Sequence, residues 1–259
     1  MIASKRSDLK KTDWEIDFYS RPIIDENGKK RWELLITSTN NFKDKKTFKW
    51  EKICPASSVN SIWLKDAFDE AIDEAYLQGW DKPSVIRCWR SSMKTMIKRA
   101  ADQIGIELIS SRRTYSLLEW LIERERSFYP QQKGYTGVNL APPSNPITNQ
   151  AIPLPEEVRG ESWSFASLSL NTLREADEWE IEFSNLIPIK DSINENISIP
   201  GIRLFSPKRS LALAAWLGGL EPAKLLIEGT QIILEAGQAD RWLVTDVEEE
   251  AKKVIANNF

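Results

Sequence analysis

The sequence contains no histidine and only two cysteines among its 259 residues. Without histidine, the chain cannot build a Ser-His-Asp triad, a histidine general base or a histidine metal ligand. Cys54 and Cys88 are too few for a disulfide framework or a zinc site, and they fit a reducing compartment. These absences exclude the commonest hydrolase and structural-zinc chemistries.

Other signals are missing as well. The chain has no run of about 18 apolar residues, so we expect no membrane span. The first residues, MIASKRSDLKKTD, lack the apolar core of a secretory signal and do not look like an organelle transit peptide. Neither GxxxxGK[ST] nor GxGxxG occurs, so nucleotide-dependent chemistry and a nucleotide cofactor have no support.

Tryptophan is abundant, with 11 residues spread along the chain. Hydrophobic residues make up 41% and charged residues 28%, which is typical of a soluble globular protein. Most of these tryptophans are expected in hydrophobic cores, and a minority could stack on unpaired bases. The length is enough for two modest cores.

Residues 13–37 (DWEIDFYSRPIIDENGKKRWELLIT) predict a β-hairpin. Apolar and polar side chains alternate along residues 14–19 with the two-residue period of a strand. Residues 25–28 (DENG) predict the turn, because Asn and Gly accept the backbone conformations that tight turns need. Residues 32–36 predict the return strand, and a shorter echo, EWEIEFSNLIPI, occupies residues 178–189.

The rest of the first half alternates helices with short strands. Strands are expected at residues 47–53, 85–89 and 106–110, and helices at residues 58–78, 93–104 (capped by Ser91-Ser92) and 115–126. The order β-β-β-α-β-α-β-α predicts an α/β domain with a mixed sheet covered by helices. Ribonuclease H-like folds share this order, which at this point is an analogy of fold.

A proline-rich, nearly uncharged stretch follows, and residues 130–158 are expected to form an extended linker. The linker separates a flexible N-terminus (1–12) and an N-terminal α/β domain (13–129) from a C-terminal α/β domain (159–259). In the last domain, we expect strands at 163–170, 179–187, 199–205, 231–234 and 241–245, and helices at 207–217 and 248–257. Its β-β-β-α start resembles that of the first domain and suggests a duplicated architecture.

Charge is distributed unevenly. Residues 82–113 contain eight Lys/Arg and two acidic residues, a local net charge of +6. Because the whole chain has a net charge of −3, the remaining residues together carry −9. Parallel sheets usually bind ligands at the carboxyl ends of their strands, where cations neutralise phosphates and aromatic rings stack on bases. The alternative is a solvated helix face beside a buried tryptophan. The candidate contacts are Arg87, Trp89, Arg90, Lys94, Lys98, Arg112 and Arg113.

Asp17 is the residue that a ribonuclease H-like nuclease would use on its first strand, with Glu70 or Asp73 as a second metal ligand. Arginines stand where the fourth strand should supply another acid, and they would compete with a metal ion. The simpler interpretation is that Asp17 pairs with Arg21, Lys30 or a backbone amide. We therefore expect no metal site and no catalytic residue.

Three blocks of sequence resemble the Tab2/Atab2 family of cyanobacteria and chloroplasts: WEIDFYSRPIIDENGKKRWELLI, PLPEEVRGESWSFASL and LEAGQADRWLVTD. The resemblance extends from about residue 13 to residue 247. The family-motif positions are Trp14, Asp17, Phe18, Tyr19, Arg21, Pro22, Trp32 and Glu33, followed by Glu235, Ala236, Gly237, Asp240, Arg241 and Trp242.

The resemblance implies a non-enzymatic RNA-binding protein of two family domains, without a cofactor. Chloroplast members bind A/U-rich 5′ leader RNA and promote translation of a photosystem I subunit, so single-stranded RNA is the expected partner, with translation or photosystem assembly factors beside it. A cyanobacterial member would act in the cytoplasm, and plastid relatives in the chloroplast stroma. Arg21, Lys29, Lys30, Arg241 and Trp242 join the candidate RNA contacts. The alternatives are a ribonuclease H-like metal-dependent nuclease and an assembly scaffold that binds no RNA.

One departure from the family concerns the C-terminus. Family members typically continue with an aromatic-rich segment ending in a Trp-Leu-Leu-like tripeptide that matters for RNA binding, whereas this chain stops at Phe259. The resemblance leaves open whether the second domain is naturally short or truncated. A missing pair of strands would leave its sheet with an exposed edge.

Overall fold

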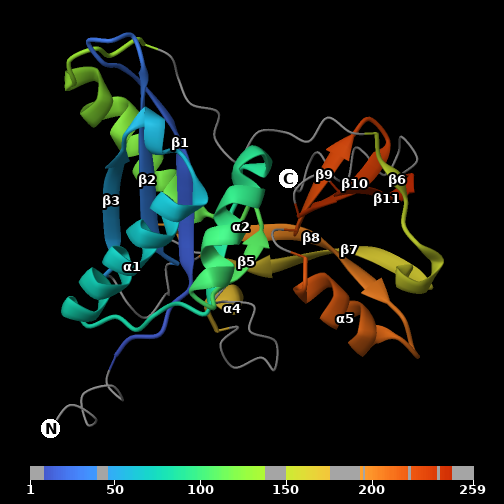
Figure 1. Cartoon of the computed structure of the whole chain (residues 1–259). Coiled ribbons are helices and arrows are strands. Elements are labelled where there is room, and N and C mark those ends of the chain that lie inside the picture. The colour runs from blue at the N-terminus through green and yellow to red at the C-terminus, as the bar shows by residue number, and fades with distance from the viewer. Residues whose placement is uncertain are drawn as a thin grey trace, which may run out of the picture. The chain divides into compact units, whose positions relative to one another are not determined.

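The computed structural model of the chain describes residues 9–39, 46–137, 150–175, 193–194, 196–220, 223–237 and 240–246. The chain forms two compact units, Met1–Asn145 and Pro146–Phe259 (Figure 1). Both units mix strands with helices, which confirms the α/β class. None of the helices in these ranges is long and apolar enough to cross a membrane.

The expected hairpin opens the first unit. Strand β1 (Trp14–Ile24) pairs antiparallel with β2 (Lys30–Ser38). In the turn, Oδ1 of Asp25 accepts hydrogen bonds from the backbone amides of Asn27 at 2.9 Å and Lys29 at 2.8 Å. Gly28 has a φ of +75°, which a residue with a side chain rarely adopts. The turn residues therefore set the register of the two strands.

Three further strands complete the first sheet: β3 (Lys49–Cys54), β4 (Val85–Cys88) and β5 (Glu107–Ser110). The spatial order is β3-β2-β1-β4-β5. Strands β1 to β3 are antiparallel neighbours, whereas β4 runs parallel to β1 and β5 parallel to β4. The sheet is mixed, as the sequence predicts, and its strand order is also that of ribonuclease H-like folds, which remains an analogy of fold.

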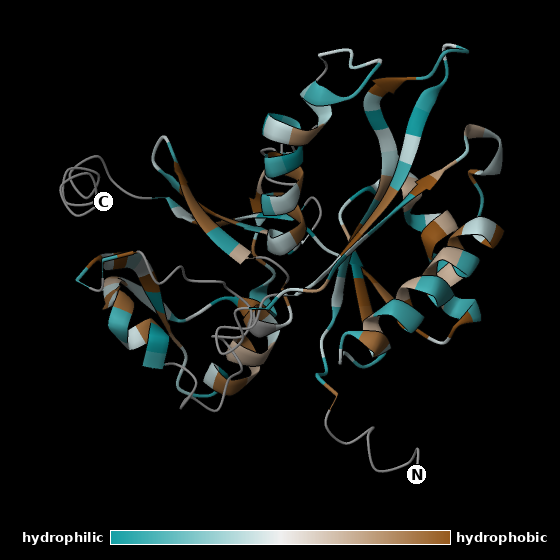
Figure 2. Ribbon diagram, turned by 90° about the vertical axis from the view of Figure 1, so that its left-hand side faces the viewer, coloured by the Kyte–Doolittle hydropathy of each residue, from teal (hydrophilic) through white to brown (hydrophobic). Residues whose placement is uncertain are grey.

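Helices cover both faces of this sheet (Figure 1). On one face, Trp14, Ile16 and Phe18 pack with buried residues of α1 (Ser61–Leu77) and α2 (Lys94–Gln103). On the other face, Leu35 packs with Leu117 and Leu121 of α3 (Tyr115–Glu123). Figure 2 shows the hydrophobic residues along the strands and on the helices beside them.

The start of α2 differs from the expectation that Ser91-Ser92 cap it. The two serines belong to a 3-10 turn, η3 (Ser91–Met93), and Met93 stands at the N-cap position. Met93 packs against the core, and the turn that carries it there includes both serines. At the other end, Gly105 has a φ of +65° just past α2, a backbone conformation that glycine favours at this position.

The chain after α3 returns to the hairpin. Helix α3 continues into a π-helical turn, η4 (Arg124–Phe128), and a 3-10 turn, η5 (Tyr129–Gln131). Next, the amide of Ile24 donates to the carbonyl of Gly134 at 2.9 Å, and the amide of Thr136 donates to that of Pro22 at 2.9 Å. Residues 134–136, within the proline-rich stretch, therefore pair with the end of β1.

The second unit contains two sheets. One has the order β6-β11-β10-β9, built from β6 (Ile152–Pro153), β9 (Ala223–Glu228), β10 (Gln231–Ala236) and β11 (Asp240–Asp246). The other is a hairpin of β7 (Ser162–Ser169) and β8 (Ser198–Phe205). Ile232 is buried beneath Trp163, Phe165, Ile202 and Val244, which join the two sheets. The short helices are α4 (Leu170–Arg174) and α5 (Ser210–Gly218), with 3-10 turns η2 (Ala56–Ser58) and η6 (Glu156–Val158) elsewhere.

The expectations for the second unit are met where they can be compared. Strands β7, β8, β10 and β11 and helix α5 coincide with predicted elements. The expected strand 179–187 and helix 248–257, with the echo at 178–189, lie outside the described residues, so the duplication stays a prediction. Strand β9 was not predicted, although Gly229 (φ +59°) and Thr230 mark the turn between β9 and β10.

Candidate nucleic-acid interface

Strand β1 is buried on both faces, and one of these faces is charged. Glu15 is 1% exposed and Asp17 is 0% exposed. The register of β1 and β2 sets Asp17 opposite Leu35 and Tyr19 opposite Glu33, so acids from both strands lie on the α3 side of the sheet. Buried carboxylates are tolerated only with close partners.

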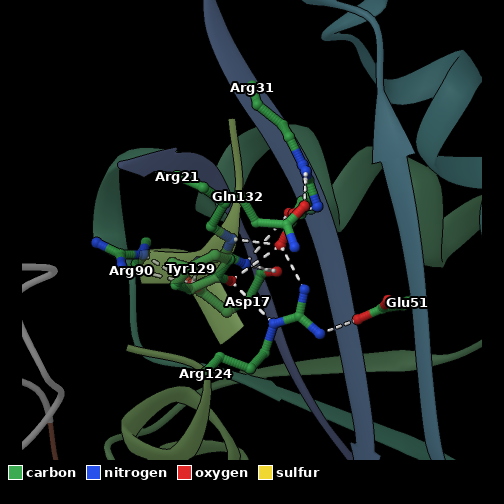
Figure 3. Close-up of polar contacts among 9 residues, drawn as sticks. Asp17, Arg21, Arg31, Glu51, Arg90, Arg124, Tyr129 and Gln132 are labelled. Carbon is green, nitrogen blue, oxygen red and sulfur yellow. Dashed lines mark hydrogen bonds and ion pairs between the residues drawn. The ribbon is translucent and has the colours of Figure 1, made fainter. Parts of the chain in front are cut away.

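Two arginines neutralise Asp17 (Figure 3). Nη1 of Arg21 lies 2.7 Å from Oδ2, and Nε of Arg90 lies 2.5 Å from Oδ1. Burial by itself would raise the pKa of Asp17, but the charges and hydrogen bonds of Arg21 and Arg90 hold it below its usual range. Asp17 is therefore an ionised carboxylate enclosed by guanidinium groups.

Glu33 extends the same cluster. Its carboxylate lies 3.3 Å from Nε of Arg21, 2.5 Å from Arg31 and 3.2 Å from Arg124. The hydroxyl of Tyr129 donates to Glu33 at 2.9 Å, and burial raises the pKa of that hydroxyl to about 12. We call the whole group the Asp17 network: Asp17, Arg21, Arg31, Glu33, Glu51, Arg90, Arg124 and Tyr129.

The Asp17 network carries a positive excess and does not resemble a metal site. It has four arginines against three carboxylates, a net charge of +1. Within the described ranges, no group of three or more Asp, Glu, Cys or His side chains is arranged to hold a metal ion. The expected pairing of Asp17 with Arg21 is confirmed, and Arg90 occupies the other carboxylate oxygen.

Arg90 also joins two aromatic rings. Its Cζ lies 3.8 Å from the ring centroid of Tyr19 and 4.1 Å from that of Trp89. Both rings are half-buried, whereas Arg90 is 8% exposed. Trp89 packs against the small core cluster of Leu35 and α3. A guanidinium at these distances stacks favourably on aromatic faces.

Glu15 has a separate role beside the network. Its Oε2 accepts a hydrogen bond from the backbone amide of Leu117 at 3.0 Å, so the carboxylate of β1 caps the first turn of α3. Burial raises the pKa of Glu15 to about 7, against the lowering effects of the Leu117 amide, Arg113 and Arg87. Arg87 in addition forms an ion pair with Asp13 at 2.6 Å.

The candidate RNA contacts fall into groups of different exposure. Lys29, Lys30, Lys94 and Lys98 are exposed, and Trp89, Arg112 and Trp242 are half-buried. The buried members are Arg21, Arg87, Arg90, Arg113 and Arg241. RNA contact by any of them stays a prediction.

The LEAGQADRWLVTD block of the second unit also contains a buried carboxylate that pairs with cationic side chains. Glu235 is 2% exposed and lies 3.1 Å from Nε of Arg241 and 3.1 Å from Nζ of Lys224. Arg241 also pairs with Glu228. The ring of Trp242 lies 5.4 Å from that of Trp216 on α5. The motif therefore ties β9, β10, β11 and α5 together.

Sequence reasoning missed several members of these clusters. Arg124, Tyr129 and the capping role of Glu15 were not singled out. The alternation of β1 does put Glu15 and Asp17 on one face, but a single sequence does not reveal that this face is buried. That burial depends on α3 and on the turns after it, which are distant in sequence.

A five-stranded mixed sheet whose central aspartate pairs with two arginines, followed along the chain by a second unit of strands and helices, describes a two-unit α/β protein. Sequence comparison specifies the family. Residues 13–124 match the N-terminal domain of "RNA-binding protein Tab2/Atab2", and residues 141–259 match its C-terminal domain. The chain belongs to the Tab2/Atab2 family of RNA-binding proteins.

Two curated relatives are both named "Protein TAB2 homolog, chloroplastic". The one from Arabidopsis thaliana is 32% identical over 241 residues, which cover 89% of this chain and 61% of that protein. The one from Zea mays is 31% identical over 249 residues, covering 92% and 61%. The chain therefore spans about 61% of the length of these relatives.

Solved structures give a weaker likeness. A magnesium complex of the HTLV-2 integrase catalytic core domain is 17% identical, with a TM-score of 0.28 over 51% of this chain and 82% of that one. A simian T-cell lymphotropic virus intasome in complex with PP2A regulatory subunit B56 gamma is 13% identical, with a TM-score of 0.27 over 91% and 79%. At these TM-scores the likeness carries no argument.

Proposed function

We propose that this chain binds A/U-rich single-stranded leader RNA and promotes translation of photosystem subunits, without catalysing a reaction. The observation that carries the proposal is the match of both units to the Tab2/Atab2 RNA-binding family. Translation factors or photosystem assembly factors are the further partners. The place of action is the cytoplasm for a cyanobacterial protein and the chloroplast stroma for its plastid relatives.

The cationic residues of the first unit fall into two groups, buried arginines and exposed lysines, and we assign RNA binding to the exposed group. The buried arginines of the Asp17 network hold the sheet together, because their guanidinium groups are occupied by carboxylates. Lys94 of α2 and Lys29 and Lys30 of the hairpin turn are exposed to phosphates. Lys98 is exposed as well, because its ion pair with Asp102 lies at the surface and is weak. Non-specific affinity for RNA depends mainly on such exposed cations.

Fluorescence anisotropy with a labelled A/U-rich single-stranded RNA tests this proposal over a series of salt concentrations. The variant Lys94→Ala with Lys98→Ala should bind more weakly. The slope of log K against log salt should lose about 0.7 for each phosphate contact removed.

A matched control is Lys65→Ala with Lys133→Ala, which removes the same charge elsewhere. Lys65 pairs with Asp69 four residues on, as Lys98 pairs with Asp102, and Lys133 pairs with Glu26. The control should keep the slope of the unmodified chain. An equal slope in both double variants would contradict the assignment of the α2 cations, and failure of the unmodified chain to bind would contradict the function itself.

The position of Asp17 in a ribonuclease H-like sheet makes a nuclease the second candidate. Labelled RNA incubated with Mg²⁺ or Mn²⁺ should stay intact, because arginines occupy both oxygens of Asp17. Cleavage that Asp17→Asn abolishes would establish the nuclease instead. A chain that neither binds nor cuts RNA would support the assembly scaffold.

A further inference from the structure

We propose that Tyr19 and Trp89, whose rings both contact the guanidinium group of Arg90, form a stacking subsite for an unpaired nucleobase. The subsite depends on the proposed RNA-binding function and adds the place where a base is held. Tyr19 lies in β1 and Trp89 follows β4, 70 positions later in the chain. The parallel pairing of these two strands brings the residues together.

The guanidinium group of Arg90 lies over both rings. The guanidinium carbon of Arg90 lies 3.8 Å from the centroid of Tyr19 and 4.1 Å from that of Trp89. Tyr19 also meets Trp32 edge-on, with ring centroids 5.8 Å apart. Rings fixed in this way lose little further freedom when a ligand binds, which favours affinity.

The carboxylate of Asp17 fixes the position of the Arg90 guanidinium group. It is 0% exposed and receives Nε of Arg90 at 2.5 Å and Nη2 at 3.4 Å. Moving Arg90 away would leave a buried carboxylate with one partner fewer, which is strongly unfavourable. Arg90 is thus a positioning residue: it is buried and contacts two rings that are only half-buried.

The charge of the site selects the kind of ligand. A cationic ligand would be repelled by Arg90 and by the net charge of +1 of the Asp17 network. A neutral planar base on an anionic backbone suits both the rings and the positive field. Exposed Ser91, Ser92 and Lys94 follow Trp89 along the chain and offer contacts for the adjacent phosphate.

The test compares Trp89→Leu with Trp120→Leu in the full chain. Trp89 and Trp120 are both half-buried and both pack against Leu35, Leu117 and Leu121, so they are matched in packing. The probes are a labelled A/U-rich RNA and the same RNA with abasic positions. The unmodified chain should bind the abasic RNA about 5- to 150-fold more weakly, since a stacked base contributes that much.

Trp89→Leu should lose this preference for bases, whereas Trp120→Leu should keep it even if both variants melt at similarly lowered temperatures. Tyr19→Leu, a second variant, should lose part of the preference. Arg90→Lys, which keeps the charge but not the planar group, should reduce it without changing the salt slope.

If the unmodified chain binds RNA but Trp89→Leu and Tyr19→Leu still distinguish the abasic probe, the subsite is wrong and the function stands. If the unmodified chain binds neither probe, the proposed function fails with it. A loss of base preference in Trp120→Leu equal to that in Trp89→Leu would show only disturbed packing and would overturn the subsite.

Discussion

Nε of Arg90 lies 2.5 Å from Oδ1 of Asp17, although 73 positions separate the two residues. The pair connects the middle of β1 with the segment that leaves β4. In this sheet it occupies the place where a metal-dependent nuclease would need its first carboxylate free. The ion pair therefore links β1 to the segment that follows β4.

Asp17→Asn should lower the free energy of unfolding by about 3–5 kcal/mol, because two buried guanidinium groups lose their anionic partner. Urea unfolding followed by circular dichroism measures the loss. Breaking the exposed pair of Lys98 and Asp102 with Lys98→Ala should change stability by less than about 1 kcal/mol. Equal effects of the two substitutions would contradict the importance of the buried pair.

Glu15 should make the stability of the first unit depend on pH. Its pKa is raised by burial from 4.5 to about 7 in the folded protein, so the folded state binds more protons than the unfolded state between these values. The contribution of Glu15 to the free energy of unfolding is therefore fully present below about pH 4.5. It is lost as the pH rises through about 7, and the total loss is roughly 3 kcal/mol.

The substitution Glu15→Gln isolates this effect, since its carbonyl oxygen can still accept from the Leu117 amide. Relative to the unmodified chain, the variant should gain stability as pH rises from about 4.5 to 7. Unfolding curves recorded across this range give the difference. A difference that stays constant with pH would refute the raised pKa.

Gly134→Ala should weaken the attachment of residues 134–136 to the hairpin. A Cβ at this position would lie 2.0 Å from the carbonyl oxygen of Ile24, and Gly134 has a φ of +85°. We expect a loss of at least about 2 kcal/mol in the free energy of unfolding. Gly137→Ala is the control, since Gly137 also has a positive φ (+72°) but open space around it. Thermal melting of both variants makes the comparison, and an equal loss would assign the effect to backbone conformation alone.

Divalent metal ions should leave the thermal stability unchanged. The described residues offer no cluster of three acidic or thiol ligands, and arginines fill the surroundings of Asp17. Melting temperatures with Mg²⁺, with Mn²⁺ and with EDTA should agree. A rise in melting temperature with metal that disappears in Asp17→Asn would point to a metal site there.

Local patterns predicted most of the fold of the first unit. The alternation along residues 14–19 and the DENG turn specify β1 and β2, and the spacing of apolar residues specifies α1 and α2. Strand β9 was not predicted from the sequence. Its apolar run is short and largely exposed, so apolar and polar residues do not alternate along it with the period of a strand. The serines before α2 were misassigned because Met93 packs against the core, a long-range contact.

The sequence by itself determined the element order of the first unit, the family resemblance and the absence of histidine chemistry, because these are properties of local pattern and composition. Only the tertiary structure decided which charged residues are buried. Residue type alone made Arg87, Arg90 and Lys94 equal candidates for RNA contact. The packing of β1, β4 and α3 buries the two arginines beside acids and leaves the lysine exposed, because carboxylate partners distant in sequence offset the cost of removing each guanidinium from water.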